Sequence, residues 1–287
     1  MDYTNCELCP RRCGVDRSAG ERGWCGAPGT ALVAKIMLHQ WEEPVLAPNG
    51  NSGAIFFGGC TLGCIYCQNR AISKRAVGTP MDAAQLRSVM EELVADGAEN
   101  IDFVTPTQYL PTILPVLEPK LPVPVIYNCG GYERVATLKQ LAGKVDIYLP
   151  DLKYSDSALA ENLSGAKNYF SVAKLALKEM VRQTGAPQWE GEKLVRGTVV
   201  RHLILPGQVE NSLRVLDWLG DHFKPGEILV SLMRQYTPME ATENLPPFDR
   251  KITDEEYDAV LSWMYLNGLE GFVQEDTAAD SQFIPDF

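Results

Sequence analysis

One short stretch limits the fold of this chain more than any other. Residues 54–57, Ala-Ile-Phe-Phe, form an apolar run typical of a buried strand, and two glycines follow it directly. Cys60, Cys64 and Cys67 come next, with the spacing CX3CX2C. Three thiolates on one short loop can hold three irons of a four-iron cluster and leave the fourth iron open to a small molecule. The pattern therefore predicts a buried strand that leads into a metal-binding loop.

A closed metal site would need more ligands than this loop supplies. A closed iron–sulfur cluster uses four cysteines, usually at other spacings. A structural zinc site also needs a fourth ligand and often uses paired CXXC segments. Two alternatives stay open at this point: the three cysteines are part of a zinc site, or they have no ligand role in a reducing compartment.

The aromatic residue Tyr66 stands directly before the last cysteine of the motif. With it, the stretch resembles the signature of the radical S-adenosylmethionine (SAM) enzymes. The resemblance implies that a 4Fe-4S cluster binds to the three cysteines and that SAM caps the open iron through its amino and carboxylate groups. It also implies that one electron cleaves SAM to methionine and a 5′-deoxyadenosyl radical, which takes a hydrogen atom from a substrate.

Composition and charge exclude several classes of protein. The chain has 287 residues, of which 45% are hydrophobic and 22% charged, as in soluble globular proteins. A net charge of −11 argues against nucleic acid or an anionic membrane as the main partner. The sequence has no visible signal peptide and no apolar run near the roughly 18 residues of a membrane helix. We therefore expect a cytoplasmic protein, in which eight cysteines indicate metal or redox chemistry more than disulfides.

The N-terminus carries a second group of cysteines with the spacing CX2CX3CX11C, namely Cys6, Cys9, Cys13 and Cys25. This segment is rich in glycine and poor in apolar residues, so we expect a bound metal to fold it. Zinc fits four thiolates, and a second iron–sulfur cluster fits equally well. Unligated or disulfide-bonded cysteines are the alternative. The expected domains are a Cys-rich metal-binding segment, residues 1–38, and a barrel, residues 39–287.

The rest of the chain alternates between apolar runs and amphipathic segments. Strands are expected at residues 31–38, 54–57, 101–104, 123–127, 145–149, 197–205, 228–232 and 272–274. Helices are expected at residues 81–97, 111–117, 133–141, 155–162, 169–184, 212–222 and 254–266. Repeated βα units imply an α/β fold with a parallel sheet and right-handed crossovers. With the resemblance, this pattern indicates a partial (β/α)6 TIM-like barrel of the radical SAM type.

Charged residues also follow the first expected strand. His39, Glu42 and Glu43 could line the mouth of the cluster site. A solvated charged rim is the expectation for the two glutamates.

In such barrels the chemistry lies at the C-terminal ends of the strands. Relatives often carry a Gly-Gly-Glu-type segment that binds the SAM amino group, where this chain has Thr105 and Thr107 on either side of a proline. Their hydroxyls or backbone could do that work, and a plain turn is the alternative. Asn128 stands where relatives place a Thr-Asn-Gly-like segment and could bind the ribose or carboxylate of SAM. Gly130 permits a close approach of the backbone.

Further candidates follow the next two strands. Asp151 and Lys153 resemble the Asp-Leu-Lys element of the activating enzymes of glycyl-radical proteins, in which both side chains face the SAM pocket; an ordinary salt bridge is the alternative. Arg201 could pair with the SAM carboxylate in a fork geometry. We expect His202 to be a hydrogen-bonded structural histidine and Cys129 to be a buried free thiol.

The resemblance covers about residues 39–238 and is nearest to the uncharacterised paralogues of pyruvate formate-lyase activating enzyme. It implies an oxidoreductase that takes electrons from a donor such as flavodoxin or ferredoxin. The substrate would be a glycine of a glycyl-radical protein, another peptide or a small molecule, and nothing in the sequence encodes which. A different class stays open as well: an iron–sulfur electron carrier or scaffold without SAM chemistry.

Overall fold

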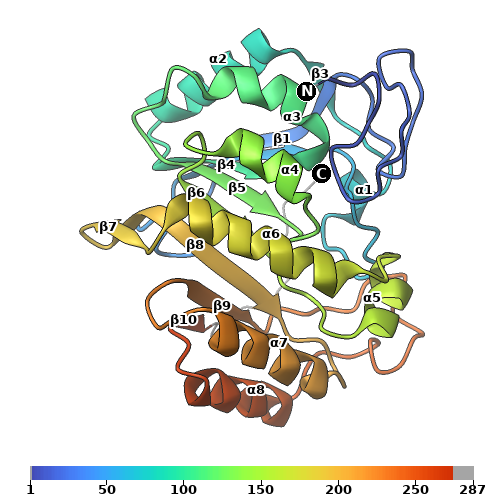
Figure 1. The fold of residues 1–287 in the computed structure, drawn as a ribbon, viewed down its shortest axis with the longest axis vertical. Helices are drawn as coiled ribbons and strands as arrows, with labels where there is room; N and C mark the ends of the chain where they lie inside the picture. Colours follow the sequence, from blue (N-terminus) through green and yellow to red (C-terminus); the bar gives the residue numbers. More distant parts are fainter. Residues whose placement is uncertain (1, 274–287) are drawn as a thin grey trace.

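The computed structural model describes residues 2–273, and these are built around one ten-stranded mixed sheet (Figure 1). The strand order is β10-β9-β8-β6-β5-β4-β2-β1-β3, and β7 pairs with β8 beside this path. Seven of these strands run parallel: β2 (Ser52–Phe57), β4 (Asn100–Val104), β5 (Val125–Cys129), β6 (Ile147–Pro150), β8 (Lys193–Leu203), β9 (Leu229–Met233) and β10 (Gly271–Val273). The predicted βα alternation and parallel sheet are confirmed.

Three strands in the described residues run antiparallel to their neighbours: β1 (Ala31–His39), β3 (Thr79–Met81) and β7 (Gln188–Glu190). The sequence did not predict β3 or β7. Both have three residues, β3 carries a proline at its centre, and all three residues of β7 are exposed, so neither shows an apolar alternation. Edge strands of this kind leave little signal in a sequence.

Helices cover the outer face of the sheet (Figure 1). They are α2 (Ala83–Ala95), α3 (Leu110–Ile113), α4 (Val135–Leu138), α5 (Ser157–Ser164), α6 (Tyr169–Thr184), α7 (Val209–His222) and α8 (Asp254–Leu266), and the short α1 (Arg70–Ser73) follows the cysteine loop. Short 3-10 turns extend α3 and α4, so the helices expected at residues 111–117 and 133–141 are each split in two. The bounds of α6 and α8 agree with the prediction, and no helix among residues 2–273 is long and apolar enough to cross a membrane.

Alternation along the strands separates an outer from an inner face. On β5, Tyr127 and Cys129 pack outward in the apolar cluster under the helices, whereas Ile126 belongs to a separate inner cluster. That inner cluster is closed by a loop residue, Leu46, and consists of Leu46, Ile126, Ile147, Leu149, Leu194, Val199 and Leu229. The carbonyl of Leu46 accepts a hydrogen bond from Asn100 at the start of β4. The inside of the barrel is therefore filled by apolar side chains near the N-terminal ends of its strands.

The N-terminal segment before β1 contains no helix or strand among its described residues. β1 itself pairs with β2, so the domain boundary expected at residue 38 falls inside a strand of the sheet. The predicted strand at residues 272–274 corresponds to β10 up to Val273, and Gln274 lies outside the described residues.

Candidate active site

The cysteine loop begins where β2 ends, at one edge of the parallel sheet. Two glycines form the exit from the strand. A Cβ atom on Gly58 would lie 2.1 Å from the carbonyl oxygen of Val77, and one on Gly59 would lie 2.7 Å from that of Cys25. Gly59 also has a φ of +81°. The two glycines therefore let the loop leave the strand between two backbones that no larger residue would fit.

The three thiols of the motif lie in a common environment. Burial raises the pKa of Cys60 first, and the neighbouring thiols of Cys64 and Cys67 raise it further. Burial also raises the pKa of Cys67, with Cys64 as the next cause. Three thiolates in such a place repel one another, and bound metal is what makes them stable, since a coordinating thiol gives up its proton. The loop is thus suited to a metal centre with a thiolate from each cysteine.

Each sulfur of the motif accepts one hydrogen bond. Ser164 Oγ donates to Cys64 Sγ over 2.9 Å, Ser73 Oγ lies 3.5 Å from Cys67 Sγ, and Leu62 N lies 3.4 Å from Cys60 Sγ. Hydrogen bonds to ligand sulfurs hold them in place and tune the reduction potential of an iron–sulfur cluster. The sequence did not single out either serine, because each reaches its cysteine only through the fold.

A chain of hydroxyl groups continues inward from Ser164. Its Oγ lies 2.6 Å from Tyr154 Oη, which lies 2.5 Å from Tyr66 Oη. Tyr66 and Tyr154 are buried in the apolar cluster beneath α5, α6 and α7. The aromatic residue of the motif therefore connects to Cys64 through two hydroxyls and is fixed by packing.

An arginine from the N-terminal segment supports the same loop. Arg11 donates three hydrogen bonds to carbonyl oxygens, which are those of Thr61 (3.0 Å), Gly165 (2.5 Å) and Ser164 (3.3 Å). Its guanidinium lies 3.8 Å from the ring centre of Trp24 and 5.2 Å from that of Tyr132. The Cys-rich segment is thereby tied to the cysteine loop and to the end of α5, a contact that the sequence did not reveal.

Four of the predicted residues meet at the strand ends. Arg201 Nε donates to Asp151 Oδ1 over 2.9 Å, and Arg201 Nη2 donates to Asn128 Oδ1 over 2.5 Å. Lys153 Nζ donates to the other carboxylate oxygen of Asp151 over 2.6 Å. Burial alone would raise the pKa of Asp151, but Arg201 and Lys153 outweigh burial and hold it below its usual value. The network is a charged, hydrogen-bonded group from β5, β6 and β8 near the cysteine loop.

Among residues 2–273, the hydroxyl of neither predicted threonine has a hydrogen bond to the side chains of this network. Thr107 is buried, and its hydroxyl is used by Glu133 Oε1 at 2.7 Å and by Tyr127 Oη at 3.0 Å, on the outer side of the sheet. Thr105 has a φ of +59°, and its N–H donates to the carbonyl of Asn128 over 2.8 Å. The fold uses the hydroxyl of Thr107 and the backbone N–H of Thr105, and a role of either threonine in binding SAM stays a prediction.

Gly130 lies directly against the cysteine loop. A Cβ atom there would be 2.8 Å from Leu62 Cδ1, and the carbonyl of Gly130 accepts a hydrogen bond from Tyr169 Oη over 2.9 Å. The side chain of Leu62 occupies the space beside this glycine, and a contact of Gly130 with a cofactor stays a prediction.

Two glutamates occupy a different place from the one predicted. Glu43 is 9% exposed, and its Oε1 accepts a hydrogen bond from Ser231 Oγ over 2.6 Å. Glu42 is also largely buried, and its Oε1 lies 3.9 Å from Arg201 Nη1. The expectation of a solvated rim is wrong, because the fully buried Leu46 draws the loop after β1 into the barrel.

His202 and Cys129 behave as predicted. His202 Nδ1 lies 2.6 Å from the carbonyl of Leu152, so this nitrogen carries the proton, and Nε2 accepts from Ser212 Oγ over 2.8 Å. Burial lowers the pKa of His202 to about 4. Cys129 is buried on the outer face, where burial raises the pKa of its thiol. Both residues are structural in this fold.

The N-terminal cysteines are all free thiols. Burial raises the pKa of Cys9 to about 12, and Cys25 and Cys13 contribute in the same direction. Among residues 2–273, no three His, Cys, Asp or Glu side chains are grouped to hold one metal ion. A zinc site needs such a group, whereas the thiolates of a four-iron cluster each bind a different iron. The metal at the N-terminus stays a prediction.

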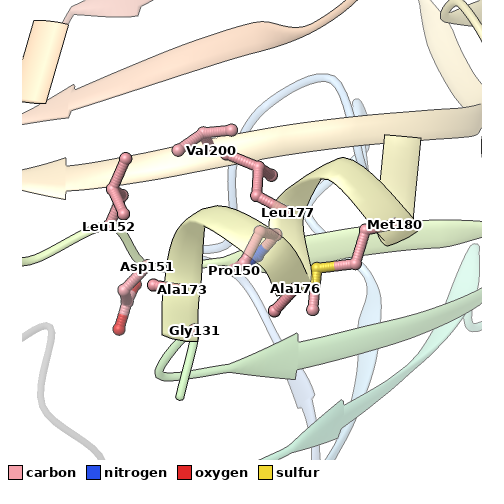
Figure 2. Close-up of a pocket in the computed structure, with 9 residues that line it drawn as sticks. All are labelled: Gly131, Pro150, Asp151, Leu152, Ala173, Ala176, Leu177, Met180 and Val200. Carbon is pink, nitrogen blue, oxygen red and sulfur yellow. The ribbon is translucent and has the colours of Figure 1, made fainter. Parts of the chain in front are cut away.

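A crevice beside this network is not a ligand site (Figure 2). It lies between α6 and the sheet and is too narrow to admit a water molecule. Its lining consists of Gly131, Pro150, Asp151, Leu152, Ala173, Ala176, Leu177, Met180 and Val200. Figure 2 shows the carboxylate of Asp151 turned away from the apolar side chains of α6. This carboxylate belongs to the strand-end network and not to the crevice.

No protein-family model matches the chain. One curated relative does: an uncharacterized protein of Methanocaldococcus jannaschii, MJ0674, is 29% identical over 273 residues. The match covers 90% of this chain and 74% of the relative. Since the relative is itself uncharacterized, this likeness assigns no activity.

Solved structures share the architecture at low sequence identity. SuiB of Streptococcus suis, bound to its precursor peptide SuiA, matches with a TM-score of 0.53 and 13% identity over 76% of this chain and 47% of SuiB. A radical SAM methyltransferase of Sphaerobacter thermophilus matches with a TM-score of 0.52 and 14% identity, over 77% of this chain and 66% of the enzyme. Methylornithine synthase PylB matches with a TM-score of 0.50 and 15% identity, over 74% of this chain and 60% of PylB.

The fold is that of the radical SAM enzymes. At these identities the likeness concerns the fold alone, and this chain spans about half the length of SuiB. Within the radical SAM fold described here, the CX3CX2C loop and the network around Arg201 lie at the C-terminal edge of the parallel strands. This is the edge at which βα barrels carry their chemistry.

Proposed function

We propose that this protein is a radical SAM enzyme in which Cys60, Cys64 and Cys67 hold a 4Fe-4S cluster and SAM binds at the open iron. The observation that carries the proposal is the position of the three thiols. They follow the first parallel strand, beside a network of hydrogen-bond donors, in a fold that radical SAM enzymes share. When bound, the cluster and SAM supply a 5′-deoxyadenosyl radical that abstracts a hydrogen atom from the substrate.

The residues present fit a cluster of this kind. Cys64 and Cys67 lie close enough to raise the pKa of Cys60, Cys64 also raises the pKa of Cys67, and each of the three sulfurs accepts a hydrogen bond from a serine or from the backbone. Gly130 leaves the space that the side chain of Leu62 fills beneath the loop. No ligand of the cluster is required beyond these three, since the open iron takes its ligand from SAM.

The strand-end network suits the binding of a carboxylate or a ribose. Arg201 and Lys153 offer N–H donors that are oriented by Asp151, and the side-chain amide of Asn128 is held between Arg201 and Asp102. Preorganised donors of this kind position a bound group at little further cost in entropy. In our proposal they orient SAM, while the buried tyrosines beneath the loop keep water away from the reacting carbon.

The finer assignments rest on the resemblance and on the spacing of the cysteines. Activation of a glycyl-radical protein is supported by the resemblance of the element from Asp151 to Lys153 to that of activating enzymes. Modification of another peptide or of a small molecule is the alternative. Flavodoxin or ferredoxin remains the proposed electron donor, and cytoplasm the proposed location. A second metal at the N-terminal cysteines is supported by their spacing and by the burial of Cys6 and Cys9.

The test is anaerobic. The protein is reconstituted with iron and sulfide and reduced with dithionite, SAM is added, and 5′-deoxyadenosine is followed by chromatography. We expect product from the native chain and none from Cys64→Ala, with Cys129→Ala as the matched control, because Cys129 is a buried thiol outside the motif. Product from Cys64→Ala would overturn the ligand assignment. An intact reducible cluster that never cleaves SAM, with any substrate, would favour an electron carrier.

Iron and zinc are counted on the same sample. About four irons per chain with one zinc would place zinc at the N-terminal cysteines, and about eight irons would place a second cluster there. About four irons without zinc would leave the N-terminal cysteines unligated.

A further inference from the structure

Cys64 differs from the other two cysteines of the motif in its surroundings. Its sulfur accepts a hydrogen bond from Ser164 Oγ over 2.9 Å, and the hydroxyl of Tyr154 is also within hydrogen-bonding reach of it. Among residues 2–273, the sulfurs of Cys60 and Cys67 have longer contacts, 3.4 Å to a backbone N–H and 3.5 Å to a serine hydroxyl. Two hydroxyl groups thus converge on one sulfur, and the function proposed above gives the tyrosine hydroxyls no role.

The backbone holds the end of α5 against the cysteine loop. Ile65 N donates to the carbonyl of Leu163 over 2.9 Å, and Arg11 donates to the carbonyls of the next two residues. Ser164, the last residue of α5, is fully buried between these contacts. The fold therefore fixes the serine hydroxyl opposite the sulfur of Cys64.

Aromatic packing fixes the two tyrosines in the same way. The ring of Tyr154 meets that of Tyr169 edge-on, with 5.2 Å between the ring centres. The ring of Tyr66 lies 5.9 Å from that of Tyr236 at a tilted angle. Both tyrosines belong to the apolar cluster beneath α5, α6 and α7, so their hydroxyls are polar groups in an apolar setting. Hydrogen bonds in such a setting are stronger than in water and reinforce one another.

A count of protons fixes the direction of the hydroxyl chain. Ser164 Oγ lies 2.6 Å from Tyr154 Oη, which lies 2.5 Å from Tyr66 Oη. In the described part of the molecule, the chain ends in one acceptor that is not a hydroxyl, the sulfur of Cys64. A metal-bound thiolate can only accept. Tyr66 therefore donates to Tyr154, because the reverse order would leave the buried O–H of Tyr66 without an acceptor.

We propose that Ser164, Tyr154 and Tyr66 are positioning residues that hold the Cys64 sulfur and raise the reduction potential of the bound cluster. A donor at a ligand sulfur stabilises the reduced state more than the oxidised state, because the added electron increases the negative charge on sulfur. The inference rests on the proposed function, since it needs the cluster. It adds to that function by naming the groups that determine how readily an electron donor reduces the site.

The test measures the midpoint potential of the reconstituted chain in the absence of SAM. Dithionite and redox mediators set the potential anaerobically, and the electron paramagnetic resonance signal of the reduced cluster is followed. Ser164→Ala and Tyr154→Phe should each make the midpoint more negative by about 59 mV, which is a tenfold change for one electron. Iron per chain is counted on the same samples and should equal that of the native chain.

Two hydroxyls outside the chain supply the controls. Tyr148→Phe removes a buried hydroxyl that donates to Gln183 on the outer side of the sheet, and it should leave the midpoint unchanged. Ser73→Ala removes the longer contact at another cysteine and should shift the midpoint less than Ser164→Ala. If Ser164→Ala does not fold, Tyr154→Phe carries the comparison.

A double variant tests whether the hydroxyls act as a chain. Tyr66→Phe alone should make the midpoint more negative, but by less than Tyr154→Phe, because Tyr66 reaches the sulfur through Tyr154. In the Tyr154→Phe background, Tyr66→Phe should have no further effect. Additive shifts would show that the two tyrosines act separately and would overturn the chain.

Unchanged midpoints in Ser164→Ala and Tyr154→Phe, with full iron content, would overturn the proposal. An equal shift in Tyr148→Phe would do the same, since it would indicate a general effect of losing a buried hydroxyl. The potential does not depend on SAM cleavage. The expected shifts without any 5′-deoxyadenosine would therefore leave this inference in place while the proposed radical chemistry failed. A native chain that never holds a reducible iron centre would overturn both.

Discussion

Arg201 is the residue on which the strand-end network depends, because it donates to both Asp151 and Asn128. A lysine at this position keeps the charge but cannot make both bonds from a planar fork. We expect Arg201→Lys to retain its iron and to bind SAM about tenfold more weakly, as measured by equilibrium dialysis. Arg214→Lys, on the exposed side of α7, is the control and should bind SAM normally. Unchanged binding by Arg201→Lys would remove this residue from the SAM site.

His202 predicts how the stability of the protein depends on pH. Its pKa in the folded protein is about 4, below the ordinary 6.5, so the unfolded chain takes up the proton first. The stabilising effect is complete above pH 6.5 and is lost as the pH falls toward 4. Urea unfolding should show a loss of about 2 kcal/mol from this group between about pH 7 and about pH 5. His202→Gln should remove that part of the slope, and His222→Gln, at the exposed end of α7, should not.

Several site residues were predictable one at a time and others were not. The cysteines, Asn128, Asp151 and Arg201 could be named because each belongs to or directly follows an apolar strand, and parallel strands end at one edge. Ser164 and Arg11 gave no such signal, since their partners lie 100 and 50 residues away in the chain. Glu42 and Glu43 were misplaced because their burial depends on where the loop after β1 packs.

At the scale of the elements, Gly131 joins β5 to the turn that carries Tyr132. It has a φ of +75°, and a Cβ atom there would lie 2.1 Å from the carbonyl oxygen of Asp151. We expect Gly131→Ala to lower the free energy of unfolding by about 2 kcal/mol or more, because backbone would have to move. Gly143→Ala is a matched control, since Gly143 has a φ of +77° and nothing among the described residues within 4 Å of the added atom. Equal losses in the two variants would indicate that φ strain alone is responsible.

Two of the predicted helices, α2 and α8, begin with a local signal that can be read in the sequence. α2 begins after Asp82, whose side chain accepts a hydrogen bond from the backbone N–H of Gln85, while the side chain of Gln85 accepts one from the backbone N–H of Asp82. α8 begins with the same device at Thr253. By contrast, α3 and α4 are short and continue as 3-10 turns, so their extent is set by packing against the sheet and could not be predicted from periodicity.

At the scale of the whole molecule, the N-terminal segment and the barrel are connected by Arg11 and by the contact between Cys25 and Gly59. Cys9→Ala removes a predicted ligand that lies outside the CX3CX2C loop. We expect the spectrum of the main cluster to persist and the segment before β1 to be cut faster by protease, because its proposed metal is lost. Loss of both signals would indicate one shared metal site. An unchanged rate of cleavage would indicate that no metal folds this segment.

The contacts of Arg11 and Ser164 also bear on the biosynthesis of the protein. The cysteine loop leaves the ribosome well before α5. The hydroxyl group of Ser164, which donates to Cys64 Sγ, lies at the end of α5, and so do two of the three carbonyl groups that accept hydrogen bonds from Arg11. A nascent chain that ends after the motif thus has the cysteines but not their surroundings. Iron inserted at that stage would lie in an open loop exposed to oxygen. The structure favours insertion after synthesis has passed Gly165, when the first and the middle thirds of the polypeptide can close around the metal together.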